Sequence, residues 1–79
     1  MRGKLEISIG ILTFCSEPRL KTQVRYEVGL SFFQFQTYEE WLLSQGLLLK
    51  EANRYLTTEK GQRVVRIYIL LQNTLVSRI

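Results

Sequence analysis

The chain has 79 residues, of which 46% are hydrophobic and 23% are charged, a balance that indicates one globular domain (residues 1–79) and excludes a disordered chain. Eleven Lys and Arg residues against seven acidic ones give a formal charge of +4, which favours polyanionic partners but also fits an ordinary solvated surface. Because Cys15 is the only cysteine and histidine is absent, one chain cannot build a disulfide or a Cys/His zinc site, and we expect no cofactor.

The sequence predicts neither a signal peptide at its start nor a membrane-spanning segment. Glu6 interrupts the apolar stretch near the start, and no small-residue cleavage site follows it, so we read the start as that of a mature protein. The longest strongly apolar run, Ile67 to Leu71, is far shorter than the roughly 20 residues of a membrane span. We expect neither a membrane partner nor a small-molecule ligand.

Residues 4–15 form the first predicted element, and their pattern allows two interpretations. Apolar residues alternate with polar or small ones from Leu5 to Ile11, which is typical of a strand. The same residues also fall on two helical stripes, so a helix buried on two sides fits equally well. Pro18 predicts a break after this element, because the residue before a proline avoids the helical region. Cys15, at its end, is predicted to be a small buried hydrophobe.

The next two segments, residues 20–28 and 31–45, are predicted to form a helix-turn-helix unit. Gly29 supplies a left-handed stop after the first helix. Ser31 and Gln34 have the spacing of a capping box, which predicts the start of a longer helix. A short helix, a glycine-containing turn and a longer helix are the parts of a helix-turn-helix. We expect the longer helix to bury Phe32, Phe35, Tyr38 and Leu42 and to expose Phe33, Gln34, Gln36, Thr37 and Glu40.

Glu39 and Glu40 are adjacent acidic residues in this longer helix. Neighbouring residues on a helix point about 100° apart, so their carboxylates cannot face one substrate together. We interpret both as solvated helix surface. Because the chain also lacks histidine and any nucleophile with a plausible base, we predict that it is not an enzyme.

Residues 47–57 predict a β-hairpin, or wing. Two short extended segments, 47–50 and 55–57, flank a polar stretch at 51–54. Asn53, within that stretch, can adopt the backbone conformation that a hairpin loop demands.

Residues 58–78 predict a C-terminal helix that is apolar over most of its circumference and begins at a cap formed by Thr57 or Thr58. The β-branched run at 64–69 leaves open a buried strand instead. As a helix, the segment carries two apolar stripes, one to close the domain and one that a monomer would leave exposed. The first stripe contains Val64, Tyr68, Leu71 and Leu75, and the second contains Val65, Ile69, Val76 and Ile79.

Four segments, taken in their order along the chain, carry a resemblance to a known family. They read KTQVRY at 21–26, LSFFQF at 30–35, LLSQGLL at 42–48 and YLTTEKG at 55–61, with Tyr38 between the second and the third. In order and spacing they resemble the small archaeal winged-helix DNA-binding proteins, including crenarchaeal chromatin-type members that dimerise through a C-terminal helix. The resemblance covers most of the chain.

The resemblance implies a helix at residues 4–15 and a mainly α fold with a small β-hairpin, a winged helix-turn-helix whose C-terminal helix dimerises. Two features depart from the family pattern. Family members often carry lysines where this chain has Gln36 and Thr37, so we expect weaker phosphate affinity from the recognition helix. The C-terminal helix ends soon after its cap, at Ile79, which predicts a compact helix pair and not a long coiled coil.

In such a fold the recognition helix lies in the major groove, where Gln can pair with an adenine edge and Thr or Phe can touch a thymine methyl. The preceding helix is expected to hold phosphate, and the wing to reach the backbone or a minor groove. For Phe33, contact with the core or the partner subunit is favoured over contact with a base. The expected DNA-contacting residues are Lys21, Thr22, Arg25, Ser31, Phe33, Gln34, Gln36, Thr37, Lys50, Asn53 and Arg54.

The predicted function is double-stranded DNA binding by a homodimer, as a transcription regulator or a chromatin-associated protein in the cytoplasm, at the nucleoid. The alternative is a winged helix that binds a protein without DNA, since the recognition helix is poor in lysine and the C-terminal helix is strongly apolar. The expected dimer-interface residues are Val65, Tyr68, Ile69, Leu71, Gln72, Leu75, Val76 and Ile79.

Overall fold

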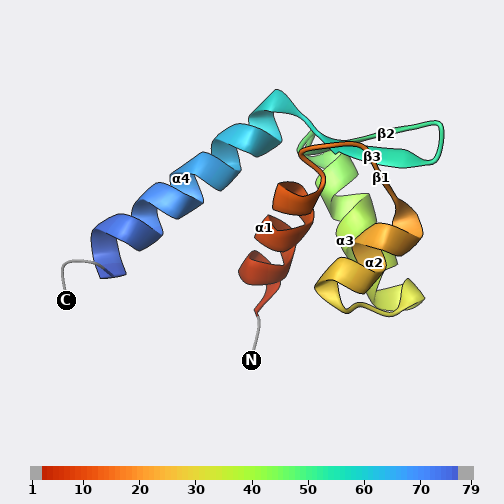
Figure 1. The fold of residues 1–79 in the computed structure, drawn as a ribbon, viewed down its shortest axis with the longest axis horizontal. Coiled ribbons are helices and arrows are strands. Elements are labelled where there is room, and N and C mark those ends of the chain that lie inside the picture. The colour runs from red at the N-terminus through yellow and green to blue at the C-terminus, as the bar shows by residue number, and fades with distance from the viewer. Residues whose placement is uncertain (1–2, 77–79) are drawn as a thin grey trace.

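The computed structural model describes residues 3–76, with side chains up to residue 75, and Figure 1 shows how the elements are arranged. Within this range the chain forms four helices and three short strands. Their bounds are α1 (Lys4–Phe14), β1 (Arg19–Leu20), α2 (Lys21–Val28), α3 (Phe32–Ser44), β2 (Leu48–Glu51), β3 (Arg54–Thr57) and α4 (Glu59–Val76). The fold is mainly helical, in the winged helix-turn-helix order that the resemblance implies.

α1 is a helix, so the strand interpretation of its alternating residues is wrong. Ile9, Ile11 and Leu12 are buried, and α1 contacts both α2 and α4. A helix that is covered on two sides carries apolar residues over most of its circumference, and this hides the helical period in the sequence.

A short strand that was not expected from the sequence, β1, forms one edge of the sheet. Arg19 lies opposite Tyr55 and Leu20 opposite Arg54, both antiparallel, and β3 pairs with β2 on its other side. The expected hairpin is therefore part of a three-stranded sheet. Because Leu20 belongs to β1, α2 begins at Lys21, one residue later than expected.

The wing turns at Ala52 and Asn53, between β2 and β3. Their φ angles are 51° and 67°, the pattern of a type I′ turn, whose twist matches that of the flanking strands. Asn adopts a left-handed backbone more readily than most residues, and the expected turn at Asn53 is confirmed. The turn leaves Lys50 and Arg54 on neighbouring strands near the tip of the wing.

The core lies where the first three helices meet the sheet. Phe35 of α3 and Tyr55 of β3 are fully buried, and their rings meet edge to face with centroids 5.7 Å apart. Cys15 is fully buried, as expected, and this burial raises the pKa of its thiol to about 11. Thr57 ties the sheet to α1, because its Oγ1 donates to the Leu12 carbonyl at 2.6 Å and its N–H to the Cys15 carbonyl at 2.8 Å. These two hydrogen bonds, to Leu12 and Cys15, anchor the wing to the C-terminal end of α1.

α4 begins beside the sheet and then extends away from the body of the domain, by which we mean residues 3–58 (Figure 1). Its start is tightly packed, since Gly61 is buried and a Cβ there would collide with the Leu47 carbonyl oxygen. Val64 and Val65 pack against the core, half-buried. The helix is continuous to residue 76, so the alternative of a strand at 64–69 is wrong.

Candidate nucleic-acid interface

The start of α2 and the wing enclose a shallow depression, which we call the α2–wing hollow. Four of its residues belong to the expected DNA-contacting set, and they come from both elements. The fold therefore brings together two groups of candidate residues that are far apart in the sequence. The hollow is lined by Leu20, Lys21, Thr22, Lys50, Asn53 and Tyr55.

Phe32, the first residue of α3, is not buried as expected but is 46% exposed. At this N-terminal end of α3 the core no longer covers the side chain, and two cations of α2 lie over its ring instead. Lys21 Nζ is 4.5 Å and Arg25 Cζ is 5.9 Å from the ring centroid, within the range of cation–π contacts. The Arg25 Nε is buried and has no hydrogen-bond partner among the described residues. Phe32 thus holds both cations beside the start of α3.

Ser31 and Gln34 form the predicted capping box of α3. The Gln34 N–H donates to Ser31 Oγ at 3.2 Å, and the Ser31 N–H donates to Gln34 Oε1 at 2.9 Å. A two-pronged contact with adenine needs both the oxygen and the NH₂ of an amide, and the oxygen of Gln34 already accepts a bond from its own helix. Gln36, which is also exposed, is the better placed of the two glutamines for base contact.

Phe33 and Thr37 are both exposed on α3. Phe33 is 79% exposed, which rules out contact with the core of its own subunit, and its ring meets Phe32 edge to face at 5.7 Å. Thr37 lies one turn farther along, at the border of α3 that faces α1. On the wing, Lys50, Asn53 and Arg54 are all exposed.

Glu39 is the main departure from the expected site, because it is buried and not solvated; only 8% of the residue is exposed. The Tyr55 hydroxyl donates a hydrogen bond to its Oε2. Two lysines of the candidate interface approach the same carboxylate, with Lys21 Nζ 3.6 Å from Oε1 and Lys50 Nζ 3.8 Å from Oε2. Burial, together with the hydrogen bond to Glu39 and its negative charge, raises the pKa of Tyr55 well above its usual range. Glu40, by contrast, is exposed as expected.

A signal for the burial of Glu39 is present in the sequence. It lies four residues after Phe35 and three before Leu42, and residues with this spacing share one face of a helix. Both neighbours are fully buried. What the sequence does not reveal is that the partners of the carboxylate come from α2 and both strands of the wing.

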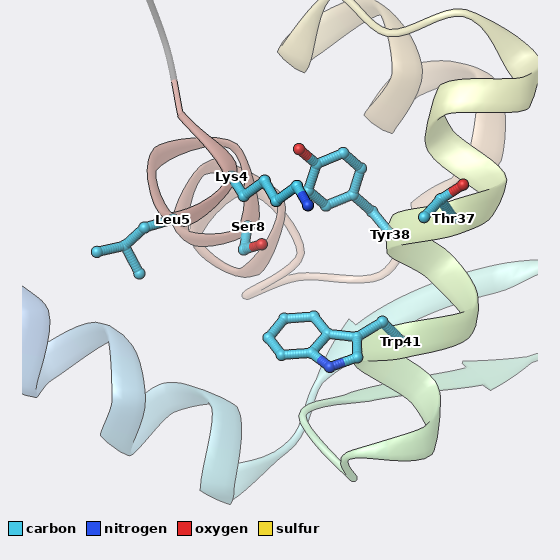
Figure 2. Close-up of a pocket in the computed structure, with 6 residues that line it drawn as sticks. All are labelled: Lys4, Leu5, Ser8, Thr37, Tyr38 and Trp41. Atoms are coloured by element: carbon cyan, nitrogen blue, oxygen red, sulfur yellow. The ribbon is translucent and has the colours of Figure 1, made fainter.

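A second hollow, about 500 Å³ and mostly apolar, opens between α1 and α3 (Figure 2). Figure 2 shows the rings of Tyr38 and Trp41 reaching from α3 toward α1. Trp41 is about half exposed, although tryptophan is usually well covered in a folded domain. This hollow was not expected from the sequence. It is lined by Lys4, Leu5, Ser8, Thr37, Tyr38 and Trp41.

The distal half of α4, residues 67–76, presents apolar side chains to solvent over residues 67–75, where side chains are described. Ile69, Leu71 and Leu75, all expected in a dimer interface, are between 49% and 65% exposed. Ile67 and Leu70, which were not among the expected interface residues, are exposed as well.

The remaining expected interface residues divide into three groups. Val65 and Tyr68 are half-buried, and Val65 packs against the core of its own subunit. Gln72 is exposed, and its Nε2 donates to the Tyr68 hydroxyl at 2.9 Å. The side chain of Val76 and the whole of Ile79 lie outside the described residues.

Two kinds of feature are absent from the described residues. Within residues 3–76, no group of three His, Cys, Asp or Glu residues is placed to hold a metal ion. Over the same range, no helix combines the length and the apolar character that crossing a membrane requires.

Comparison with known proteins agrees with the fold. The chain is 31% identical to Sso10a-2, a DNA-binding protein from Sulfolobus solfataricus, with a TM-score of 0.74 and coverage of 98% of this chain and 88% of that one. Among curated proteins, none matches the sequence. The resemblance to the small archaeal winged-helix proteins is thus confirmed. Residues 1–75 match the family model described as winged helix-turn-helix, and the chain belongs to that family.

Proposed function

We propose that this protein binds double-stranded DNA as a homodimer, with α3 in the major groove and the wing on the backbone or in a minor groove. Its role is that of a transcription regulator or a chromatin-associated protein, and not of an enzyme. The DNA-binding protein Sso10a-2 resembles it over nearly the whole chain, which supports the same kind of activity here.

The observation that carries the proposal is the convergence of cations on α3 from two other elements, α2 and the wing. Lys21 of α2 and Lys50 of the wing both lie within 4 Å of one carboxylate of α3, at 3.6 and 3.8 Å. Arg25 lies over Phe32 at the start of the same helix. Lys and Arg supply most contacts to the DNA backbone, and such contacts fix a protein in register on the duplex. A helix flanked by cations from two elements is therefore suited to lie in a groove between phosphates.

The exposed residues of α3 are polar or aromatic and include no lysine. Gln36 can read an adenine edge, and Phe33 or Thr37 can touch a thymine methyl. Because the cations lie on α2 and the wing, most of the affinity is expected from the backbone and only part from base contacts. We therefore expect modest sequence preference and a strong dependence on salt.

The dimer is proposed from α4. Exposed apolar stripes of this kind usually mark an interface, and a domain of this size buries too little surface to be very stable alone. A two-fold pair of α4 helices would cover Leu71 and Leu75, which lie one turn apart on the same stripe. It would also present two copies of α3, for which we expect half-sites about 34 to 36 Å apart on the duplex.

The test is fluorescence anisotropy of a labelled duplex, titrated at low and at moderate salt with the protein and its Arg25→Ala and Arg54→Ala variants. We expect each variant to weaken binding and to reduce the salt slope by about one unit, as for the loss of one phosphate contact. Arg63→Ala, which removes an exposed arginine from α4, is the matched control and should bind almost as well as the unmodified protein. Absence of binding at low salt by a folded protein would overturn the proposal. Affinity that barely changes with sequence would favour the chromatin role.

A second candidate function is protein binding without DNA, favoured by the apolar α1–α3 hollow with its half-exposed Trp41. In that case, the folded protein would fail to bind duplex at low salt. It would also retain a protein partner after nuclease treatment, and Trp41→Ala would lose that partner.

A further inference from the structure

Glu39 lies directly beneath the surface that we propose for DNA. Its carboxylate contacts three of the elements that form this surface, since it belongs to α3 and meets Lys21 of α2, Lys50 of β2 and Tyr55 of β3. The carboxylate is almost entirely buried, whereas both lysine side chains are partly exposed. The buried carboxylate of Glu39 therefore lies beneath Lys21 and Lys50, and both lysines remain accessible from solvent.

Glu39 attracts both lysines, but neither lysine is held to it by a hydrogen bond of normal length. Their N···O distances of 3.6 and 3.8 Å exceed those of a normal N–H···O hydrogen bond, which ends near about 3.2 Å. Each ammonium carries three donors on a flexible stem and acts as a point charge, so it does not need the carboxylate to orient it toward a phosphate. Both lysines can therefore contact a second anion without leaving Glu39.

We propose that Glu39 acts as a built-in competitor of DNA phosphate and lowers the affinity of this surface for DNA. The inference rests on the proposed function. A phosphate that approaches Lys21 or Lys50 shares that ammonium with the carboxylate and is repelled by it. The net charge of the cluster formed by Lys21, Lys50 and Glu39 is +1 instead of +2, so phosphate binding displaces fewer counterions from the duplex.

The fold does not depend on the charge of Glu39. α3 is held by the fully buried side chains of Phe35 and Leu42 on either side of it. A glutamine at position 39 keeps an oxygen that accepts the hydrogen bond from Tyr55, and it is isosteric with glutamate. Both lysine side chains are partly exposed, so water can solvate their ammonium groups once the charge of the carboxylate is removed. The charge can thus be removed while the packing and the hydrogen bond remain.

The test is the Glu39→Gln variant in the same anisotropy titration, with thermal unfolding to show that it is folded. We expect it to bind duplex roughly three- to tenfold more tightly at low salt, with a salt slope steeper by about one unit. Glu59→Gln is the matched control, because it makes the same change in net charge at an exposed position in the first turn of α4. The control should change the affinity less than twofold, as a rough bound for a charge outside the contact surface.

A double-mutant cycle with Lys50→Met tests whether Glu39 acts through the lysines. In the Lys50→Met background, the gain from Glu39→Gln should shrink, because only Lys21 is then released. Unchanged or weaker binding by folded Glu39→Gln would overturn the inference and assign Glu39 to positioning the lysines. An equal gain in Glu59→Gln would also overturn it, since net charge alone would then explain the effect. Failure of the proposed function is distinguishable, because the unmodified protein and both Gln variants would then fail to bind at low salt.

Discussion

The body of the domain and the distal half of α4 differ in whether they have an apolar core of their own. In the body, the apolar side chains of α1, α3 and the wing meet in a closed core, and two cations of the candidate interface lie around one buried carboxylate. In the distal half of α4, the large apolar side chains are themselves exposed. The body therefore has a core of its own, whereas the exposed apolar side chains of the distal half of α4 are the basis of the proposed dimer.

The largest expected effect tests the closed core of the body. Phe35→Ala removes a fully buried ring that packs against Tyr55, so we expect it to lower the free energy of unfolding by about 3 to 5 kcal/mol. Phe33→Ala, two residues earlier on the same helix, should change it by no more than about 0.5 kcal/mol because that ring is exposed. Urea denaturation measures both. Equal losses would show that the core does not lie where we place it.

The next effect tests the open surface of α4. Leu71→Glu and Leu75→Glu place a charge in the proposed subunit contact, where a buried leucine contributes about 1.5 to 3 kcal/mol. We expect each variant to weaken dimerisation by roughly tenfold or more. Sedimentation equilibrium gives the dissociation constants directly.

Gln62→Glu is the matched control for these two variants. It introduces the same negative charge at an exposed position of α4, but outside the distal half of the helix. It should leave dimerisation nearly unchanged. A dimer that survives all three substitutions would mean that subunits associate through another surface, with the α1–α3 hollow as the next candidate.

A smaller effect concerns the junction of α1 with the wing, where Cys15 is buried. Its thiol has a folded pKa of about 11 against an ordinary value of 9.0, because burial disfavours the thiolate. The stability that comes from keeping the thiol neutral is complete below pH 9 and is lost as the pH rises toward 11. Between pH 8 and pH 10 we expect this group to contribute a loss of about 1 kcal/mol. Cys15→Ala should flatten this part of the urea-denaturation profile, and an identical slope in both proteins would contradict the assignment.

Local signals in the sequence were enough to predict much of the body. The capping box of Ser31 and Gln34 and the turn at Asn53 depend on residues close in sequence, and both are present in the structure. The helical state of residues 4–14 required the resemblance to a family, because coverage by two helices gives α1 the alternation of a strand. β1 escaped prediction because two residues, Arg19 and Leu20, carry no periodicity and become a strand only through β3.

The candidate site was predictable in part. The cations of α2 and the wing could be named from the sequence, because helix starts and hairpin tips are recognisable. The burial of Glu39 could not be inferred with its partners, since Lys21, Lys50 and Tyr55 meet it only in the folded chain. The prediction that Phe32 is buried is wrong because its surroundings, too, are set by the folded chain. It shares the helical spacing of Phe35 but lies where the core has ended, so its covering is cationic and not apolar.

The most direct test of the central claim is NMR mapping of a duplex onto the two regions. A ¹⁵N-labelled sample is titrated with duplex DNA, and backbone amide shifts are followed residue by residue. We expect the large changes at Lys21, Gln36 and Arg54, with little change at Leu71 and Leu75. Changes confined to the distal half of α4 would contradict the account, because DNA would then bind the surface that we assign to the partner subunit.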